Sequence, residues 1–407
     1  MRTEESEQVE PTFPTPQNSS VILFYDDVTV FGGHEKMALC LIAQFLRFTR
    51  YSVVFVFSDK NQRLAAELDA LQRQYPDRIS VVPVPITSGQ MPTLEMVWQF
   101  PQLISLFLLL KQIAPAFAII VQGNIELSVK GLVAAWAAGI PAVSYLPAVF
   151  HFKDIPGPPL ARVRDFCNKV LFRVADAFIV ISQRFKDLLQ NEGRHSEDLF
   201  LIRNLIDTER LFTEDRAQAR DELELPQTPT IVTIIGRIYF DGKGQDLALN
   251  ALSSLLDENL RLLIVGDGPD FERLIKLATL QIAEGKVIVK NWVDNPSLIY
   301  SASDLILMPS MLEGMPLVLL ESLYLGKPIV ASDIPPFDEY LLPERRFKPN
   351  DTKSLRQCVV NAVEGIRTGL LTTAADSSIT FDSDINRQNI LRLVSFMERK
   401  SGRVPNA

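Results

Sequence analysis

The stretch LILMPSMLEGMPLVLLESLYLG, residues 305–326, contains a strand, a loop and a helix in immediate succession. Its first four residues are all apolar, which is typical of a parallel strand buried on both faces. The pattern from Leu317 to Leu325 predicts a helix that ends before Gly326, and Pro316 suits its first position. The segment therefore predicts one strand–loop–helix unit of a parallel α/β sheet.

Two carboxylates flank the turn of this unit. Glu313 lies in the loop, and Glu321 lies one helical turn into an almost wholly apolar helix. A buried carboxylate needs a partner, so we expect Glu321 to bind a hydroxyl-rich ligand; the alternative is an ordinary glutamate on a helix surface. The start of the helix would also aim backbone amides at this ligand. These amides belong to Gly314, Met315 and Leu317.

The same alternation of strand and helix recurs along the chain. The expected strands of a first series cover residues 21–25, 53–57, 79–82, 117–121, 142–145 and 178–181. Those of a second series cover residues 230–235, 260–265, 287–289, 305–308 and 329–331. Each series predicts a doubly wound parallel sheet of Rossmann-like type. Because ligands of such sheets bind beyond the carboxyl ends of the strands, two facing sheets predict an interdomain cleft.

The predicted domains follow from this division. Residues 1–20 are acidic and rich in Pro and Thr, so we expect a disordered tail without the pattern of a signal peptide. Residues 21–205 form the first domain and residues 206–384 the second, with a hinge around residues 204–207. The last segment, residues 385–407, contains a helix that can cross back to the first domain.

Composition restricts the class of protein. The chain has 407 residues, of which 47% are hydrophobic, and a net charge of -8. Such a charge argues against a nucleic-acid partner, which would require a concentrated basic face. The three cysteines show neither metal-ligand spacing nor a disulfide framework, which fits a reducing cytoplasm. The most apolar stretch, residues 103–121, is divided by Lys111, Gln112 and Pro115 into a helix and a strand too short to span a bilayer.

A basic, glycine-rich loop follows the first strand of the second series. It reads GRIYFDGKG, residues 236–244. Gly236 permits a close approach, and Arg237 and Lys243 can neutralise a diphosphate. The spacing is not that of a P-loop, so hydrolysis of a nucleoside triphosphate is disfavoured. Taken alone, the loop is equally compatible with a solvated basic turn.

The corresponding loop of the first domain is FGGHE, residues 31–35. Gly32 and Gly33 would allow an anion or a sugar to approach the start of a helix. The pair His34 and Glu35 resembles the start of a zinc-binding helix, but no histidine follows at the required spacing, so we expect no metal. His151 lies in a loop after the fifth strand, where a role in the cleft and a plain surface position are about equally compatible.

Together these residues resemble the family 4 glycosyltransferases, which are retaining enzymes of GT-B fold. The motifs that carry the resemblance follow in the order of the family: GRI with Lys243-Gly244, LIVGDGP at 263–269, MPS with EGMPLVLLE at 308–321, and GKPIVAS at 326–332. AFIVIS at 177–182 and RNLID at 203–207 resemble the strand before the hinge and the hinge turn of the family. The hinge has Asn204-Leu205 where the family usually has Asn-Gly.

The resemblance implies a role for each candidate residue. Arg237 and Lys243 would hold the diphosphate of a nucleotide-sugar donor, Glu321 its ribose, and Glu313 with the following amides a hydroxyl of the transferred sugar. Gly32 and Gly33 would border the phosphate and the acceptor, and His151 would be the cleft histidine, although Pro147 occupies the more usual place. We expect no cofactor and no metal, because two cations and a helix start already balance the diphosphate.

The expected reaction is transfer of a sugar to a hydroxyl of a glycan, a lipid-linked molecule or a small molecule. A sugar-nucleotide epimerase and a non-catalytic accessory subunit of the same fold are the alternatives. The presence of all four charged residues argues against an accessory subunit. The chain has too few acid and base groups for an epimerase. Residues 162–173 alternate basic and apolar side chains, which predicts either a peripheral helix at the inner face of a membrane or a packed helix with a charged face.

Overall fold

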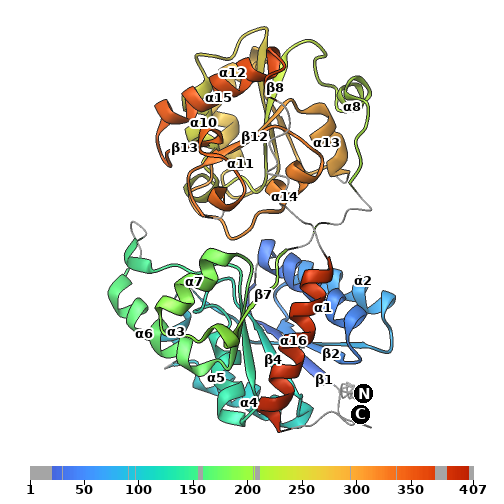
Figure 1. Cartoon of the computed structure of the whole chain (residues 1–407), viewed down its shortest axis with the longest axis vertical. Helices are drawn as coiled ribbons and strands as arrows, with labels where there is room; N and C mark the ends of the chain where they lie inside the picture. Colours follow the sequence, from blue (N-terminus) through green and yellow to red (C-terminus); the bar gives the residue numbers. More distant parts are fainter. Residues whose placement is uncertain are drawn as a thin grey trace, which may run out of the picture. The chain divides into compact units, whose positions relative to one another are not determined.

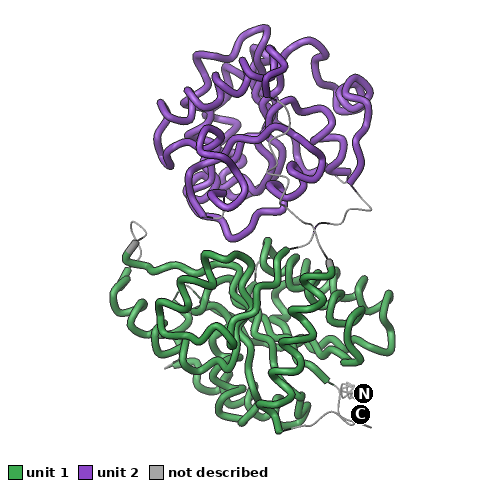
Figure 2. The backbone as a smooth tube through the Cα atoms, viewed as in Figure 1, with its two compact units in different colours: residues 1–204, 382–407 green, residues 205–381 purple. Residues whose placement is uncertain are grey.

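In the computed structural model the chain forms two compact units (Figures 1 and 2). Unit 1 comprises residues 1–204 and 382–407, and unit 2 comprises residues 205–381. The structure describes residues 21–29, 31–89, 91–96, 98–154, 159–204, 206, 211–293, 295–335, 337–371 and 383–402. The predicted tail at residues 1–20 and residues 205 and 207 of the predicted hinge lie outside these ranges.

Unit 1 is built on a seven-stranded, fully parallel sheet in the order β3-β2-β1-β4-β5-β6-β7. Its strands are β1 (Val21–Asp26), β2 (Ser52–Ser58), β3 (Ile79–Val84), β4 (Phe117–Val121), β5 (Ala142–Leu146), β6 (Ala177–Val180) and β7 (Leu199–Leu201). The central strands are buried along almost their whole length, which explains their unbroken apolar sequences. The chain reverses its direction across the sheet between β1 and β4, which places the switch point of unit 1 there.

Two layers of helices cover this sheet. The helices are α1 (Gly33–Phe48), α2 (Gln62–Gln74), α3 (Pro92–Glu95), α4 (Phe100–Ile113), α5 (Val129–Ala138), α6 (Ala161–Val174), α7 (Gln183–Asn191) and α16 (Ser383–Ser401). Because crossovers between parallel strands are right-handed, the reversal after β3 places α4, α5 and α6 on the face opposite α1 and α2. Contacts between α4 and α5 and between α5 and α6 make these three helices one continuous layer.

The C-terminal helix α16 belongs to unit 1 and packs on α1, β4 and β7. The buried Asn386 side chain accepts from the Arg203 amide (3.0 Å) and donates to the Arg203 carbonyl (2.7 Å). Further along the helix, the Tyr51 hydroxyl donates to Glu398 (2.8 Å). The last helix of the chain thus holds the backbone of Arg203, which follows β7 at the end of the first domain.

Unit 2 contains a six-stranded parallel sheet in the order β10-β9-β8-β11-β12-β13. Its strands are β8 (Thr230–Ile235), β9 (Leu260–Val265), β10 (Val287–Lys290), β11 (Leu305–Met308), β12 (Ile329–Ser332) and β13 (Arg346–Phe347). Its helices are α8 (Arg216–Glu222), α9 (Phe240–Lys243), α10 (Gln245–Leu252), α11 (Phe271–Leu277), α12 (Thr279–Ala283), α13 (Pro296–Ala302), α14 (Leu317–Tyr324) and α15 (Thr352–Arg367). One apolar cluster fills the space between the sheet and α10 and α15, and a second lies under α8 and α13. The switch point lies between β8 and β11.

These two sheets confirm the predicted fold class of two Rossmann-like α/β domains. The apolar stretch 103–121 divides as expected into α4 and β4, and among the described residues no helix is long and apolar enough to cross a membrane. One local prediction is wrong: Pro316 does not begin helix α14 but precedes it with an extended backbone (φ -71°, ψ 134°). The proline caps the helix because its fixed φ also suits the extended conformation.

Candidate functional site

The candidate donor site lies at the switch point of unit 2. Strands β8 and β11 are neighbours, and the loops at their carboxyl ends hold the two charged motifs. The Met311 amide in the loop after β11 donates to the Gly242 carbonyl in the loop after β8 (2.9 Å). This bond ties together segments that are about seventy positions apart in the sequence, so the charged side chains on them are held at one edge of the sheet.

Glycines let these loops approach each other more closely than other residues would. Gly236 and Gly266 have φ values of 147° and 149°, in a region that side chains disfavour. A Cβ atom on Gly266 would lie 1.9 Å from the Gly236 carbonyl oxygen, and one on Gly244 would lie 2.3 Å from the Pro309 carbonyl oxygen. The turns after β8, β9 and β11 are therefore fixed by backbone-to-backbone packing.

Lys243 and Glu313 form an ion pair across this edge. The Lys243 Nζ atom lies 2.5 Å from Glu313 Oε1, which also accepts from the Ser310 hydroxyl (2.7 Å). Glu313 is 8% exposed, whereas the lysine side chain is 31% exposed. The carboxylate is thus held from the protein side by a serine and from the open side by a cation that a ligand can reach.

Arg237 and two backbone amides complete the charged surface. The Arg237 side chain is exposed, and its carbonyl accepts from the buried Gln245 side chain (2.9 Å), which fixes the backbone of the loop. Throughout the described ranges, the amides of Gly314 and Leu317 donate to no protein group. Met315 is instead buried, with its sulfur near the Tyr340 hydroxyl (3.7 Å). Two cations and two available donors at a helix start make a site for an anion.

Glu321 has a protein partner that the sequence did not indicate. The hydroxyl of Tyr300, a buried residue of α13, donates to Glu321 Oε2 (2.5 Å). Burial and the negative charge of Glu321 raise the pKa of Tyr300 well above its ordinary value, so the phenol stays a donor. Tyr300 thus supplies a protein partner for this carboxylate, which a ligand was expected to supply. A carboxylate has a second oxygen, however, and its contact with a ribose stays a prediction.

The switch point of unit 1 holds a buried acidic cluster. Asp26 ends strand β1, Asp27 follows it, and Glu35 lies in the first turn of α1; all three are fully buried. The Gly32 amide donates to Glu35 (2.7 Å) in a capping box, so Gly32 caps α1 and Gly33 begins it. Gly32 and Gly33 therefore lie at the start of a helix, as was predicted from the sequence.

A second carboxylate of this cluster is neutralised by a lysine. Lys130 Nζ lies 3.3 Å from Asp27 and donates to the Thr87 carbonyl (2.7 Å), and both charged side chains are fully buried. Asp27 also accepts from the Ser88 hydroxyl (2.5 Å). This ion pair joins the end of β1 to helix α5 inside the unit.

Asp26 and His34 carry displaced pKa values. Burial, followed by the negative charge of Glu35, raises the pKa of Asp26 well above its ordinary value. Burial lowers the pKa of His34 from 6.5 to about 4, although its Nε2 lies 3.1 Å from Glu35. Ligand atoms of Asp26, His34 and Glu35 lie within 4.8 Å of one another. The sequence argument against a zinc site at His34 and Glu35 rested on helix spacing and did not include Asp26 from β1; the absence of a metal stays a prediction.

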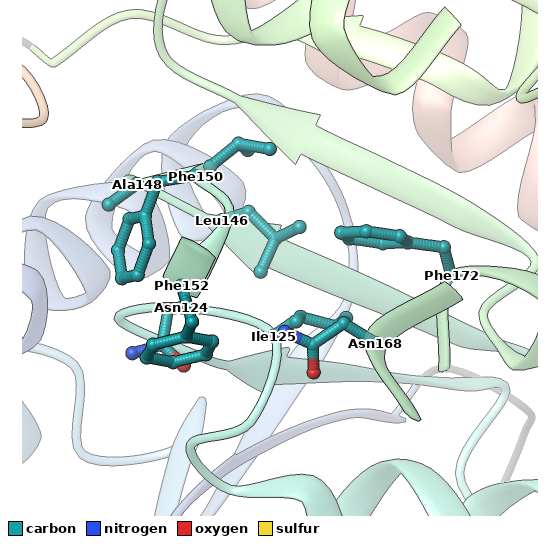
Figure 3. A pocket seen from close by; sticks show the side chains of 9 residues that line it. Asn124, Ile125, Leu146, Ala148, Phe150, Phe152, Asn168 and Phe172 are labelled. Atoms are coloured by element: carbon teal, nitrogen blue, oxygen red, sulfur yellow. The ribbon is translucent and has the colours of Figure 1, made fainter. Parts of the chain in front are cut away.

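His151 lies apart from this cluster. Its Nε2 lies 3.4 Å from Glu192, the residue that ends α7. Next to it, Figure 3 shows a small pocket between the loops after β4 and β5 and helix α6. The pocket has about 10 Å³ of space for the centre of a water molecule, and Phe152, Asn168 and Phe172 are among its lining residues. This volume accommodates about one water molecule, so the pocket is too small for a sugar.

Comparison with known proteins agrees with this arrangement. The family model Glycosyltransferase Family 4 matches residues 31–210, and the model Glycosyl transferases group 1 matches residues 215–359. Together the two matches cover both units. The chain belongs to the family 4-like glycosyltransferases. The residues predicted to bind a donor, from Gly236 to Glu321, all fall within the group 1 match.

Curated relatives align with parts of this glycosyltransferase. The D-inositol 3-phosphate glycosyltransferase of Rhodococcus jostii is 31% identical over 159 residues, 36% of this chain and 35% of its own length. The N-acetyl-alpha-D-glucosaminyl L-malate synthase of Bacillus anthracis is 27% identical over 139 residues, 34% of this chain and 36% of its own length. The chain thus spans about a third of the length of these relatives.

Solved structures match over nearly the whole chain. HepE of Anabaena in complex with UDP-glucose has a TM-score of 0.68 and 18% identity, and the match covers 94% of this chain and 99% of HepE. WaaG, a glycosyltransferase involved in lipopolysaccharide biosynthesis, has a TM-score of 0.63 and 16% identity over 95% of this chain and 100% of its own. These likenesses establish the GT-B fold.

Proposed function

We propose that this protein transfers a sugar from a nucleotide-diphosphate donor to a hydroxyl of an acceptor, with retention of configuration and without a metal. The observation that carries the proposal is the Lys243–Glu313 pair at the switch point of unit 2. A site for a diphosphate alone would need only the cations. The adjacent carboxylate, with a serine behind it, adds a group suited to a sugar hydroxyl.

The pair also suggests how the donor is received. A diphosphate carries more negative charge than one carboxylate, so it competes with Glu313 for Lys243. Once Lys243 turns to the diphosphate, one oxygen of Glu313 becomes available to accept a hydrogen bond from the sugar. The Ser310 hydroxyl continues to hold the carboxylate in place. Donor binding would then exchange one ion pair for another and position the sugar in the same step.

The chemical step needs stabilisation of the leaving group more than a nucleophile. The bond between the anomeric carbon and the diphosphate oxygen breaks, and the acceptor oxygen forms the new bond. The proton of the acceptor passes to the departing phosphate on the same face of the sugar. Arg237, Lys243 and the amides of Gly314 and Leu317 would stabilise the charge that develops on that phosphate. These groups replace the charge that a divalent ion would supply, which is the basis for proposing metal independence.

The comparisons guide the choice of substrates. HepE has been solved with UDP and with UDP-glucose, so UDP-sugars are the first donors to test. The acceptor would be a hydroxyl of a glycan, a lipid-linked molecule or a small molecule, in keeping with relatives that act in lipopolysaccharide and O-antigen synthesis. We place the reaction in the cytoplasm, where nucleotide sugars are the donors of such pathways.

The two glutamates provide the test. Glu321→Gln should weaken binding of the donor and of the free nucleotide alike, since the ribose is common to both; a lost charge-assisted hydrogen bond costs about 1.5–3 kcal/mol. Glu313→Gln should not weaken nucleotide binding, because it removes only a competitor for Lys243, and it should reduce transfer, because the sugar loses the carboxylate that positions it. Titration with UDP followed by an assay of transferred sugar separates the two.

Three outcomes would contradict the proposal. Release of UDP without any acceptor would indicate another reaction, and interconversion of the donor sugar would indicate an epimerase. Normal transfer by Glu313→Gln would show that Glu313 is not part of the site. Tyr300→Phe is the matched control, because it removes the protein partner of Glu321 and keeps the carboxylate.

A further inference from the structure

Large apolar side chains are concentrated on the outer side of one helix layer of unit 1. Helices α4, α5 and α6 follow one another on the same face of the sheet (Figure 1). Trp136 of α5 is 66% exposed and Phe166 of α6 is 70% exposed. Single exposed apolar residues are ordinary, but a set gathered on adjacent helices marks an interaction surface. The exposed members are Trp98, Phe100, Ile104, Leu108, Trp136, Leu160, Val163, Phe166 and Val170.

The spacing of these residues shows that whole helix faces point outward. Phe100, Ile104 and Leu108 recur every four positions, so they form one stripe along α4. The opposite side of α4 is buried against the unit through Leu106 and Leu110. Helix α4 is therefore apolar on both sides, although only one side has a protein partner within the described ranges. Such a helix requires a second apolar environment.

Helix α6 adds positive charge to this surface. Arg162 and Arg173 are exposed beside Val163, Phe166 and Val170, and Lys169 is 59% exposed with Glu192 at 3.7 Å. Two residues of the basic amphipathic pattern expected from the sequence do not contribute. Arg164 turns inward to the buried Glu126 (2.6 Å), and Leu171 packs in the core. Their inward positions leave the outer face of the helix with cations and apolar groups only.

Acidic side chains are missing from the outer face of this layer. Helices α4 and α5, which the structure describes completely, contain no Asp or Glu, and the one acid of α6 is Asp165. Asp165 is buried and accepts from the amides of Phe152 (2.7 Å) and Lys153 (3.1 Å). The whole chain has a net charge of -8, so a face without exposed acids contrasts with the rest of the molecule.

We propose that the outer face of α4, α5 and α6 docks on an anionic lipid bilayer. Phe166, Trp136 and the α4 stripe would enter the boundary between headgroups and acyl chains, while Arg162, Lys169 and Arg173 would lie at the level of the phosphates. Long cationic side chains combine apolar stems with charged ends, which suits this boundary. An apolar surface with cations and without acids complements an anionic bilayer. The docking does not depend on the proposed transfer reaction.

The test is co-sedimentation of the full chain with sucrose-loaded vesicles, without donor or acceptor. We expect binding to phosphatidylcholine vesicles with 40% phosphatidylglycerol at about 50 mM salt, and strong weakening at about 500 mM, because screening shortens the reach of the charges. Arg162→Gln with Arg173→Gln should lower the partition coefficient about 30-fold, at about 1 kcal/mol for each cation. Phe166→Ser should lower it about tenfold, the low end for burying a phenylalanine.

The matched control is Lys276→Gln with Leu280→Ser in unit 2, which removes one exposed cation and one exposed apolar group four positions apart. The control should bind as the native chain does, and all variants should keep the native thermal transition. Failure of the native chain to sediment with anionic vesicles at low salt would overturn the proposal. Equal loss in the control would also overturn it. Concentration-dependent dimerisation that Phe166→Ser abolishes, without vesicle binding, would assign the face to a second copy of the chain instead.

Discussion

The two units share a topology, but their switch points hold charge in opposite ways. At the switch point of unit 2, Arg237 is exposed, the Lys243 side chain is 31% exposed, and its partner Glu313 is 8% exposed. At that of unit 1, Asp26, Asp27, Glu35 and Lys130 are all fully buried. Both units thus place ionisable groups at the carboxyl ends of neighbouring strands. Only in unit 2 can a ligand reach these groups and replace one of their partners.

The comparison indicates what makes a sheet edge a binding site. An exposed ion pair contributes little to stability, so a ligand can break it at low cost. A buried pair cannot be opened in this way, because a charge left without its partner is very unfavourable. We therefore interpret the cluster of unit 1 as a structural support for the first turn of α1, and the pair of unit 2 as a receptor for an anion.

The largest expected effect comes from breaking the buried pair. Lys130→Gln leaves Asp27 without its cation, and we expect a loss of about 3–5 kcal/mol in the free energy of unfolding. Lys243→Gln removes a lysine whose side chain is 31% exposed and leaves Glu313 its hydrogen bond from Ser310, so it should cost at most about 1 kcal/mol. Denaturant unfolding of both variants measures the difference. Equal losses would show that exposure does not distinguish the two pairs.

The next effect concerns the glycines of the two switch points. Gly266→Ala combines an unfavourable φ of 149° with a Cβ atom 1.9 Å from a carbonyl oxygen, so we expect a loss of about 3 kcal/mol. Gly33→Ala meets no atom within 4 Å and begins a helix, so it should be neutral or stabilising by up to about 1 kcal/mol. Thermal unfolding of the two variants tests this. A stable Gly266→Ala variant would contradict the packing of the unit 2 loops.

The smallest of these stability effects depends on pH. The pKa of His34 is lowered to about 4 in the folded state, so between pH 6.5 and 4 the unfolded chain binds more protons. The stabilisation that the uncharged His34 provides is complete above about pH 6.5. The free energy of unfolding should fall by about 2 kcal/mol by pH 5. His34→Gln should lack this component. Asp26, whose pKa is raised, acts in the opposite sense, since the folded state keeps its proton as pH rises above 4.

The pH experiment therefore compares difference curves. Native minus His34→Gln should show a loss on acidification, and native minus Asp26→Asn should show a loss as pH rises from 4 toward the folded pKa of Asp26. Parallel curves for the native chain and both variants would mean that neither group titrates differently on folding.

Most of the fold could be predicted because buried parallel strands are unbroken apolar runs. The strands β4, β8, β9 and β11 have the predicted bounds, and the others that were predicted differ by one or two residues. No sequence pattern predicted β7 and β13, which have three and two residues. Edge strands this short are defined by pairing with a neighbour rather than by a pattern of their own.

The candidate site was predictable only in its positions along the chain. Strand ends located Lys243 and Glu313, but their direct pairing depends on the neighbouring placement of β8 and β11. Tyr300 approaches Glu321 from a different helix, and no local pattern connects them. For the unit 1 cluster a signal was present, since Asp26 ends an apolar strand and lies close to Glu35 in the first turn of the following helix.

The most direct test of the account is calorimetric titration of nucleoside diphosphates into the native chain and Lys243→Gln. UDP, GDP and ADP are each titrated, so that the identity of the base does not decide the result, and Lys276→Gln serves as the control for loss of an exposed lysine of unit 2. We predict one saturable site in the native chain, unchanged affinity in the control, and affinity at least about tenfold weaker in Lys243→Gln. Native affinity in Lys243→Gln, or no binding of any nucleoside diphosphate to the native chain, would contradict the assignment of the unit 2 switch point as the donor site.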